Sequence, residues 1–389
     1  MEPTSKSVVD ARPSHAAGEA IPVAFVSSHS SRGGSERYLA LLLEQLDPAW
    51  ISTVVCLDEG PLPDGLRSVG LPVEVITTGR HGHDVWMAAR RLRQSLRRAG
   101  SAVVHANGVK AALVAVIATG GTDIPVIWLK HDVSRDGWQA KLIARRCSRV
   151  IGVSTFVTTV FQGRTRRKVE VLHPQIPRPE IDPSSARSTV LELFAPDQPD
   201  AVVALVGRLD RFKGQEDLLA CAPAVLEAAP RTRFLLVGEE DRAHPGTAEA
   251  LRGSAIVRGV GHAVRFTGHR ADAAALICGS DLLVVAGGAN PRRMGVEGFP
   301  LVGLEALALG TPVVGYAHGG LPEQIGDCGA LVPPGDRRAL AQALIGLLSD
   351  ATARERLARC GQKRFHARYE LSTLQRELAD RYRLAVSGR

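Results

Sequence analysis

Aromatic residues are scarce in this sequence, and long apolar runs are absent from it. Phe, Trp and Tyr make up only 4% of the 389 residues. Nucleic acid is therefore an unfavourable ligand class, because single strands stack on aromatic rings and no basic run here is interleaved with them. Without an apolar run of 18 residues, no segment has the length of a membrane-spanning helix. Apolar residues nevertheless supply 45% of the chain, which predicts a soluble globular protein of about two domains.

Closely spaced cysteines and an apolar stretch near the start of the chain are also lacking. The six cysteines form no Cys-x-x-Cys pair and accompany no histidine cluster at metal-ligand spacing, so we expect them to be reduced, mostly buried and not bound to metal. The first twenty residues lack an apolar core of signal-peptide length, which predicts a disordered tail and a cytoplasmic protein, with peripheral membrane contact as an open alternative. The six cysteines are Cys56, Cys147, Cys221, Cys278, Cys328 and Cys360.

The positive charge is concentrated in the first half of the chain. Residues 1–180 carry 23 basic and 16 acidic side chains, whereas residues 181–389 carry 25 and 24, and the whole chain has a net charge of +8. This asymmetry favours a phosphorylated ligand or a lipid headgroup as a partner of the first half. The expected helix over 85–98 either lies on anionic lipid or covers a sheet with its charged face in solvent. It carries Arg90, Arg91, Arg93, Arg97 and Arg98.

Short runs rich in Val, Ile and Leu alternate with longer amphipathic stretches from Ile21 onward. This pattern predicts an α/β protein with two doubly wound, Rossmann-like parallel sheets. The first seven expected strands cover 22–27, 52–57, 73–77, 102–105, 126–129, 149–152 and 169–172. The next six cover 202–207, 234–238, 264–268, 282–286, 312–316 and 330–332.

Prolines indicate where the two domains meet. Six of them fall within 174–199, too many for one regular element. We therefore expect a tail over 1–20, an N-terminal domain over 21–176, a proline-rich linker over 177–200 and a C-terminal domain over 201–371. A helix over 372–389, with apolar residues at helical spacing, is expected to pack back toward the N-terminal domain.

Two loops that follow strands carry residues suited to phosphate. The first contains Gly33 and Gly34 just before an expected helix over 38–46, where free backbone N–H groups can meet an anion, although a tight turn explains the glycines equally well. The second contains Arg208 and Lys213, a pair suited to two adjacent phosphates, although such side chains are more often simply solvated. Neither loop has the spacing of a nicotinamide site or of a P-loop.

The stretch 297–312 is the most informative in the chain. Pro300 suits the first turn of a short apolar helix, and Gly310 suits its C-terminal cap. Glu305 is then a carboxylate in a mostly buried helix, where the two hydroxyls of a ribose can satisfy it. Glu297 precedes the helix and can reach a second hydroxylated group. The alternative is one salt-bridged and one solvated glutamate.

Taken together, these segments resemble family 4 of the retaining glycosyltransferases, which have the GT-B fold of two Rossmann-like domains facing across a cleft. The resemblance extends from about Ile21 to Arg383. It is carried by 33–37, 103–105, 130–132, 150–154, Gly207-Arg208, Lys213-Gly214, Glu297 to Glu305 (a Glu-x7-Glu element), 319–323 and 333–336.

The resemblance implies a role for individual residues. Arg208 and Lys213 hold the diphosphate of a nucleoside-diphosphate sugar of the UDP, GDP or ADP type, with help from the Gly33 and Gly34 amides. Glu305 binds the ribose. The remaining implied contacts are Glu297 and His131 to the transferred sugar, backbone groups of Gly298, Phe299, Pro300 and Leu301 to sugar and phosphate, and Asn107 and Lys130 to the acceptor.

Three segments depart from the family pattern. His173-Pro174-Gln175 stands where relatives often have Pro-Asn-Gly, and Asn107 stands where many have a second histidine. A longer loop over 287–296 brings Arg292 and Arg293 beside the expected sugar site, as added contacts or as a solvated loop.

The implied reaction keeps the anomeric configuration and needs no metal or other cofactor, and the sequence has no Asp-x-Asp motif. A small molecule, a lipid or a glycan is the acceptor. The 41 arginines against seven lysines suit a GC-rich bacterial genome and thus cell-envelope or secondary-metabolite glycosylation. A non-catalytic sugar-nucleotide or anionic-lipid binding protein, a glycoside hydrolase and a glycan phosphorylase remain as alternatives.

Overall fold

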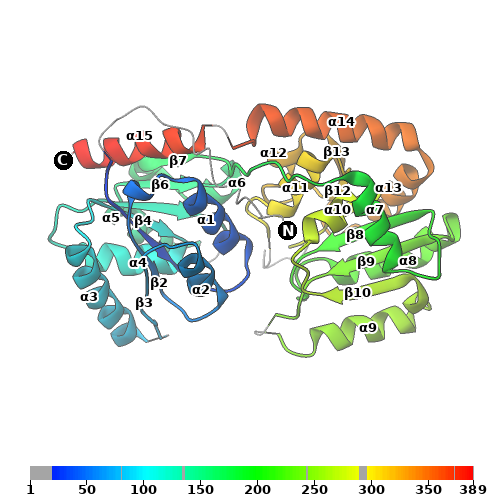
Figure 1. Ribbon diagram of the computed structural model, residues 1–389, viewed down its shortest axis with the longest axis horizontal. Helices are drawn as coiled ribbons and strands as arrows, with labels where there is room; N and C mark the ends of the chain where they lie inside the picture. Colours follow the sequence, from blue (N-terminus) through cyan, green and yellow to red (C-terminus); the bar gives the residue numbers. More distant parts are fainter. Residues whose placement is uncertain are drawn as a thin grey trace, which may run out of the picture.

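The computed structural model describes residues 20–79, 81–133, 136–241, 244–288, 296–371 and 373–388. The described chain forms two lobes side by side, each a parallel sheet covered by helices (Figure 1). The expected α/β architecture of two Rossmann-like domains is confirmed.

The N-terminal sheet has the strand order β3-β2-β1-β4-β5-β6-β7, and all its pairings are parallel. Its strands are β1 (Val23–Ser27), β2 (Ile51–Cys56), β3 (Val73–Val75), β4 (Val103–Asn107), β5 (Val126–Lys130), β6 (Arg149–Gly152) and β7 (Val169–Val171). Its helices are α1 (Gly34–Gln45), α2 (Pro61–Ser68), α3 (Gly82–Arg98), α4 (Val109–Ala118), α5 (Trp138–Arg146) and α6 (Thr155–Thr158), with 3-10 turns η1 (Pro48–Trp50) and η2 (Gly163–Lys168).

The C-terminal sheet has the order β10-β9-β8-β11-β12-β13. Its strands are β8 (Ala201–Val206), β9 (Thr232–Val237), β10 (Val264–Gly268), β11 (Leu282–Val285), β12 (Val313–Tyr316) and β13 (Gly329–Val332). Its helices are α7 (Pro183–Glu192), α8 (Gln215–Ala228), α9 (Thr247–Val257), α10 (Ala273–Cys278), α11 (Leu301–Leu309), α12 (Leu321–Ile325), α13 (Arg337–Ser349) and α14 (Ala351–Arg368), with the 3-10 turn η3 (Gly261–Ala263). Each strand predicted from the sequence is present within two residues of its expected ends.

Helix boundaries differ from the prediction in three places. Helix α1 begins at Gly34 rather than at residue 38, because the polar residues after Gly33 already form its first turn. Pro300 is the N-cap of α11 and not a residue of its first turn, while Gly310 ends that helix with φ 80°. The proline-rich stretch contains the ten-residue helix α7, because Pro183 is at its start, where no backbone N–H is needed, and Asp182 caps it.

The last helix, α15 (Leu374–Ser387), packs on strands β4 and β5 of the N-terminal sheet. Tyr382 is fully buried there, and its hydroxyl lies 2.8 Å from His105 Nδ1. Its ring meets Phe25 edge-on at 6.4 Å. The chain therefore leaves the C-terminal lobe after α14 and returns to the N-terminal lobe (Figure 1).

The expectation that all six cysteines are reduced is wrong for two of them. Cys328, before β13, and Cys360, on α14, form a disulfide. They are 32 residues apart in the chain, and only the packing of α14 against its neighbours brings them together. Cys56, Cys147, Cys221 and Cys278 are free thiols, the first three buried and the last partly exposed.

Helix α3 covers the N-terminal sheet with the face that contains Ala88, Ala89, Leu92 and Leu96. Its arginines point away from that buried face. The sequence left open whether this helix lies on anionic lipid or covers a sheet, and the structure shows that it covers the sheet.

Candidate functional site

A cavity of about 560 Å³ lies between the two domains. It borders the loops at the carboxyl ends of β1, β8 and β9, which is where parallel α/β sheets bind ligands. The N-terminal domain lines it with residues that include Arg32, Gly33, Gly34, Glu36 and Arg37. The C-terminal domain lines it with Gly207, Arg208, Lys213, Glu239, His269, Arg270, Glu297, Pro300, Leu301 and Val302, among others.

The first loop brings a helix N-terminus to this cavity. Gly33 is the N-cap of α1, and no side chain caps the helix there, so its first N–H groups are available to an anion. A Cβ atom at position 33 would lie 2.2 Å from Glu36 Oε2. Glycine therefore leaves room for Glu36, which is buried beneath the loop.

The second loop places Arg208 beside Asp241. Arg208 Nη1 lies 2.9 Å from Asp241 Oδ2, and this contact orients the guanidinium while leaving its other N–H groups for a ligand. The neighbouring backbones approach closely: a Cβ at Gly238 would lie 2.0 Å from the Gly207 carbonyl oxygen. Glycine at 238, with φ 150°, is what allows the loops after β8 and β9 to meet.

Lys213 and Glu297 form an ion pair at the cavity wall. Gly214, with φ 85°, follows the lysine and starts α8. A Cβ there would meet the carbonyl oxygen of Ala286 at 2.5 Å. The tight turn thus holds the Lys213 ammonium against the loop that precedes α11.

Glu305 on α11 forms an ion pair with Arg37 on α1, across the domain boundary. The Glu305 side chain is only 3% exposed, and burial raises the pKa of its carboxyl while Arg37 lowers it. Its Oε2 atom has no hydrogen-bond partner among the described residues, and Glu305 itself is not among the residues that line the cavity, although its partner Arg37 is. A buried carboxylate oxygen of this kind favours a ligand that donates a hydrogen bond.

The segment before α11 presses against the N-terminal domain. A Cβ at Gly298 would lie 1.7 Å from the backbone oxygen of His131. Ser154 Oγ donates a 2.7 Å hydrogen bond to the Gly298 oxygen. Phe299 is buried, and its ring stacks on that of His173 at 5.1 Å. Only glycine at 298 permits this approach of the two backbones.

His131 lies behind this contact, outside the lining of the cavity. Its Nε2 atom is 2.5 Å from Asn107 Oδ1, and its ring meets Tyr38 edge-on. The pKa of His131 is lowered to about 4, mainly by burial, with Asp132 opposing the shift and Lys130 adding to it. The imidazole is therefore neutral at physiological pH.

The two residues expected at the acceptor are buried. Asn107 is 1% exposed and also donates to the Ser35 oxygen at 3.2 Å. The Lys130 side chain is 2% exposed, and its ammonium lies 2.6 Å from Asp136 Oδ1. In this structure, both side chains contact protein groups and do not line the cavity.

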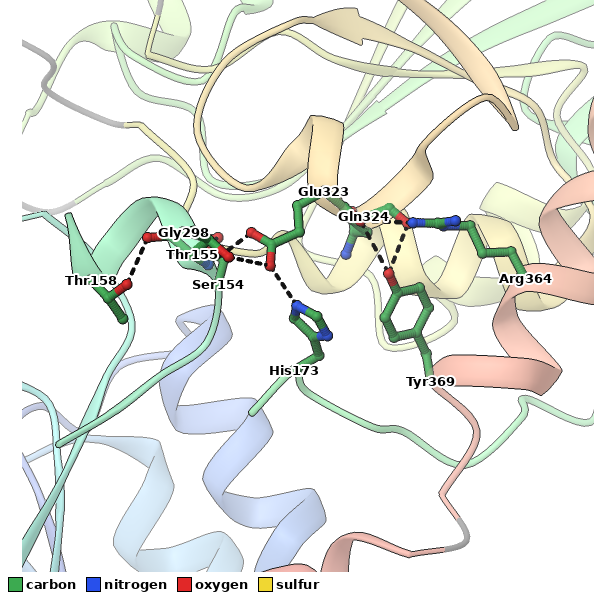
Figure 2. A network of polar contacts seen from close by, with 9 residues as sticks. All are labelled: Ser154, Thr155, Thr158, His173, Gly298, Glu323, Gln324, Arg364 and Tyr369. Atoms are coloured by element: carbon green, nitrogen blue, oxygen red, sulfur yellow. Dashed lines mark hydrogen bonds and ion pairs between the residues drawn. The ribbon is translucent and has the colours of Figure 1, made fainter. Parts of the chain in front are cut away.

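Glu323 joins the two domains through a network of hydrogen bonds. From the sequence, this residue was noted only as part of the motif 319–323. Figure 2 shows its carboxylate between the N-terminus of α6 and the interdomain crossover. It accepts hydrogen bonds from Thr155 N at 2.8 Å and Thr155 Oγ1 at 2.9 Å, and it lies 2.7 Å from His173 Nε2. Arg364 and Tyr369 donate to the backbone oxygens of Glu323 and Gln324.

Several site residues were not predicted. Arg37, Glu239, His269 and Arg270 line the cavity, but only Arg37 belongs to one of the motifs named above, and no spacing indicates that it faces Glu305. Arg292, Arg293 and most of the longer loop lie outside the described residues.

Within the described ranges, no three His, Cys, Asp or Glu side chains are grouped to hold a metal ion. No helix in the same ranges is long and apolar enough to cross a membrane.

Two family models match this chain, one on each domain. Residues 32–177 match "Glycosyltransferase Family 4", and residues 200–350 match "Glycosyl transferases group 1". Together they cover most of the chain and contain the loops that form the cavity.

Curated relatives and solved structures agree with these matches. The glycogen synthase of Mycobacterium tuberculosis is 28% identical over 322 residues, which are 79% of this chain and 75% of that protein. The phosphatidyl-myo-inositol mannosyltransferase of Mycobacterium leprae is 34% identical over 192 residues, which are 48% and 47% of the two chains. Anabaena Alr3699/HepE, solved with UDP and glucose, superposes with a TM-score of 0.81 at 22% identity and covers 93% of this chain and 99% of that chain.

Proposed function

The chain belongs to family 4 of the glycosyltransferases, and on that premise we propose that it moves a sugar from a nucleoside-diphosphate sugar to an acceptor hydroxyl or amine with retained anomeric configuration. One observation carries this proposal. Arg208, Lys213, Glu297 and the Gly33–Gly34 helix start line a single cavity between the domains.

The diphosphate of the donor lies between Arg208 and Lys213 in this proposal. The guanidinium is held by Asp241 and the ammonium by Glu297, so both cations are in place before the ligand arrives. Charge that develops on the departing diphosphate is then stabilised without rearrangement of the site. The unpaired N–H groups at the start of α1 add to this stabilisation.

The ribose of the donor donates its hydroxyls to Glu305. The support is the unpartnered Oε2 atom of a side chain that is 3% exposed. A hydroxyl donor at this atom offsets the desolvation of the carboxylate. Arg37 then keeps the second oxygen paired.

The transferred sugar lies beside Glu297 and the start of α11. Pro300 and Leu301 line the cavity there, and the His131 backbone reaches Gly298 from the other domain. In the proposed step, the anomeric carbon–oxygen bond to the diphosphate breaks, and the acceptor oxygen or nitrogen bonds to the same face of that carbon. The leaving phosphate oxygen takes the acceptor proton. Arg208 and Lys213 supply the positive charge, so the proposed step needs no metal.

A lipid, a glycan or a small molecule is the proposed acceptor. The mannosyltransferase relative is named for a phosphatidyl-myo-inositol substrate, and Alr3699/HepE was solved with UDP and glucose. We extend the nucleotide-sugar requirement to this chain, with UDP, GDP and ADP sugars as the donors to test.

The test is thermal unfolding with intact UDP, GDP and ADP sugars and with the free nucleoside diphosphates, each with and without EDTA. A donor at about a hundred times its Kd adds about 2.7 kcal/mol of stability. We expect a shift with one nucleotide family that EDTA does not change, followed by NMR of the product to show the anomeric configuration. A shift that EDTA removes contradicts metal independence, and no shift with any nucleotide favours the alternative of a non-catalytic binding protein.

A further inference from the structure

The segment from Gly137 to Val169 carries eight basic residues and no acidic residue. It contains helix α5 and the turn η2, which contact each other on the N-terminal domain. No other role has been assigned to this concentration of positive charge. The eight residues are Lys141, Arg145, Arg146, Arg149, Arg164, Arg166, Arg167 and Lys168.

Two large apolar side chains project from the same helix into solvent. Trp138 is 73% exposed and Leu142 is 50% exposed. They are four residues apart and thus neighbours on one side of α5. The opposite side is buried through Ala140, Ile143 and Ala144, so the exposed tryptophan and leucine are not needed to attach the helix to its sheet.

Most of the eight basic side chains of this segment have no carboxylate partner among the described residues. Among the described residues, only Arg149 of the eight is within ion-pair distance of an acid, Glu170 at 3.8 Å. Lys168 instead donates to the Arg145 and Cys147 oxygens at the end of α5. The exposed face of α5 therefore combines apolar side chains with uncompensated positive charge.

The arginine-rich helix α3 lacks this combination. Its one strongly exposed apolar side chain, Trp86, lies under the Arg90 guanidinium at 6.0 Å. Arg98 is paired with Glu74, and Arg93 donates to the Gly120 oxygen. This helix thus has fewer free cations and no second apolar neighbour for its tryptophan.

We infer that the face formed by Trp138, Lys141, Leu142, Arg145, Arg164 and Arg167, the α5 face, docks on an anionic bilayer surface. Tryptophan is favoured at the boundary between headgroups and acyl chains, and leucine beside it buries apolar area. Lysine and arginine around them are attracted to anionic headgroups. A zwitterionic surface offers no such attraction, so binding depends on lipid charge and on salt.

The experiment is co-sedimentation of the full chain with large vesicles of phosphatidylcholine alone or with phosphatidylglycerol added. We expect binding only to the anionic vesicles and a loss of at least tenfold in the partition coefficient between low and high salt. The double variant Trp138→Ser/Leu142→Ser is expected to lower the partition coefficient about tenfold or more. Trp86→Ser removes an exposed tryptophan from the other basic helix and is the matched control, expected to bind as the unchanged protein does.

A second variant tests the charges without touching the apolar pair. Arg164→Gln/Arg167→Gln is expected to weaken binding to anionic vesicles by about 25-fold, since each charge removed costs about fivefold. Equal binding by the Trp138→Ser/Leu142→Ser variant, or loss of binding in Trp86→Ser alone, overturns the inference. Retention on polyglutamate without binding to anionic vesicles also overturns it and assigns the face to an acidic protein.

Discussion

Arg37 and Glu305 form an ion pair that crosses the boundary between the two domains. The arginine is half exposed on α1, whereas the glutamate is buried on α11. Arg37 of the N-terminal domain pairs with one oxygen of this carboxylate, whereas the second oxygen has no partner among the described residues. Glu305 therefore joins the two domains and also carries the oxygen that we propose as the acceptor for the ribose hydroxyls.

Replacement of Glu305 by glutamine tests the ribose role. The amide has the same shape but loses the charge that strengthens hydrogen bonds from hydroxyls, an effect of about 1.5–3 kcal/mol. We expect the Kd of the nucleotide-sugar donor to rise about 10- to 100-fold in calorimetric titration. Glu355→Gln, on the exposed side of α14, is the control and should leave the Kd unchanged. An unaltered Kd in Glu305→Gln contradicts the assignment.

Lys213→Met tests the diphosphate role. Methionine keeps much of the aliphatic length but removes the charge, and loss of one preorganised group on a developing anion costs about 3–4 kcal/mol. We expect kcat/KM to fall about 10²- to 10³-fold in a steady-state assay, while the circular dichroism spectrum stays the same. Lys363→Met removes an exposed lysine of α14 and should retain activity. A fully active Lys213→Met enzyme rules out the proposed contact.

Two histidines of the N-terminal domain, His105 and His131, predict how stability depends on pH. Burial lowers the pKa of His131 to about 4 and that of His105 to about 3, from an ordinary value of about 6.5. Below pH of about 6.5 the unfolded chain binds protons that the folded chain does not bind. The free energy of unfolding therefore decreases as the pH falls from about 6.5 through about 4, by up to ~1.4 kcal/mol per pH unit for each histidine.

Urea unfolding at pH 7, 6 and 5 measures this slope. In His131→Gln one titrating group is missing. We therefore expect the free energy of unfolding to fall less steeply with decreasing pH, by the slope that corresponds to about one bound proton. Glutamine can still contact Asn107. The same slope in the variant and the unchanged protein contradicts the lowered pKa.

Glu323→Gln tests the contact between α12 and the N-terminal domain. The variant weakens the hydrogen bonds to Thr155 and His173 shown in Figure 2. Partly buried charge-assisted bonds contribute about 1–3 kcal/mol, so we expect the thermal midpoint to fall by a few degrees. The donor Kd should change less than twofold, because neither this side chain nor its partners Thr155 and His173 line the cavity. An unchanged midpoint shows that the network is not stabilising.

Much of the fold could be predicted because its strands are local patterns. A central strand of a parallel sheet is buried on both faces, so β1, β5 and β11 are almost entirely apolar runs. Such runs can be recognised without knowing which strands lie beside them. The same holds for α11, where Gly310 marks the end and the apolar composition predicts the burial of Glu305. Helix α7 was not predicted, because the six prolines of 174–199 indicated a linker. Pro183, however, stands at the first position of the helix, where proline is tolerated.

The candidate site could be predicted only in part. Gly33, Arg208 and Lys213 belong to loops that follow strands, so topology alone places them at one end of their sheets. Neither the Arg37–Glu305 pair nor the Glu323 network follows from spacing, because the partners come from different domains. The burial of Lys130 against Asp136 likewise depends on where Asp136 lies relative to the end of β5.

The sequence by itself determined the succession of strands along the chain and the buried position of Glu305, since each depends on residues close together in the chain, and its short motifs in order indicated the family. Tertiary structure decided which distant groups meet: Arg37 with Glu305, Thr155 with Glu323, and Cys328 with Cys360. Local patterns report burial and backbone conformation, whereas an ion pair or a disulfide requires two side chains to be within a few ångströms. That distance depends on how the sheets, helices and domains pack together.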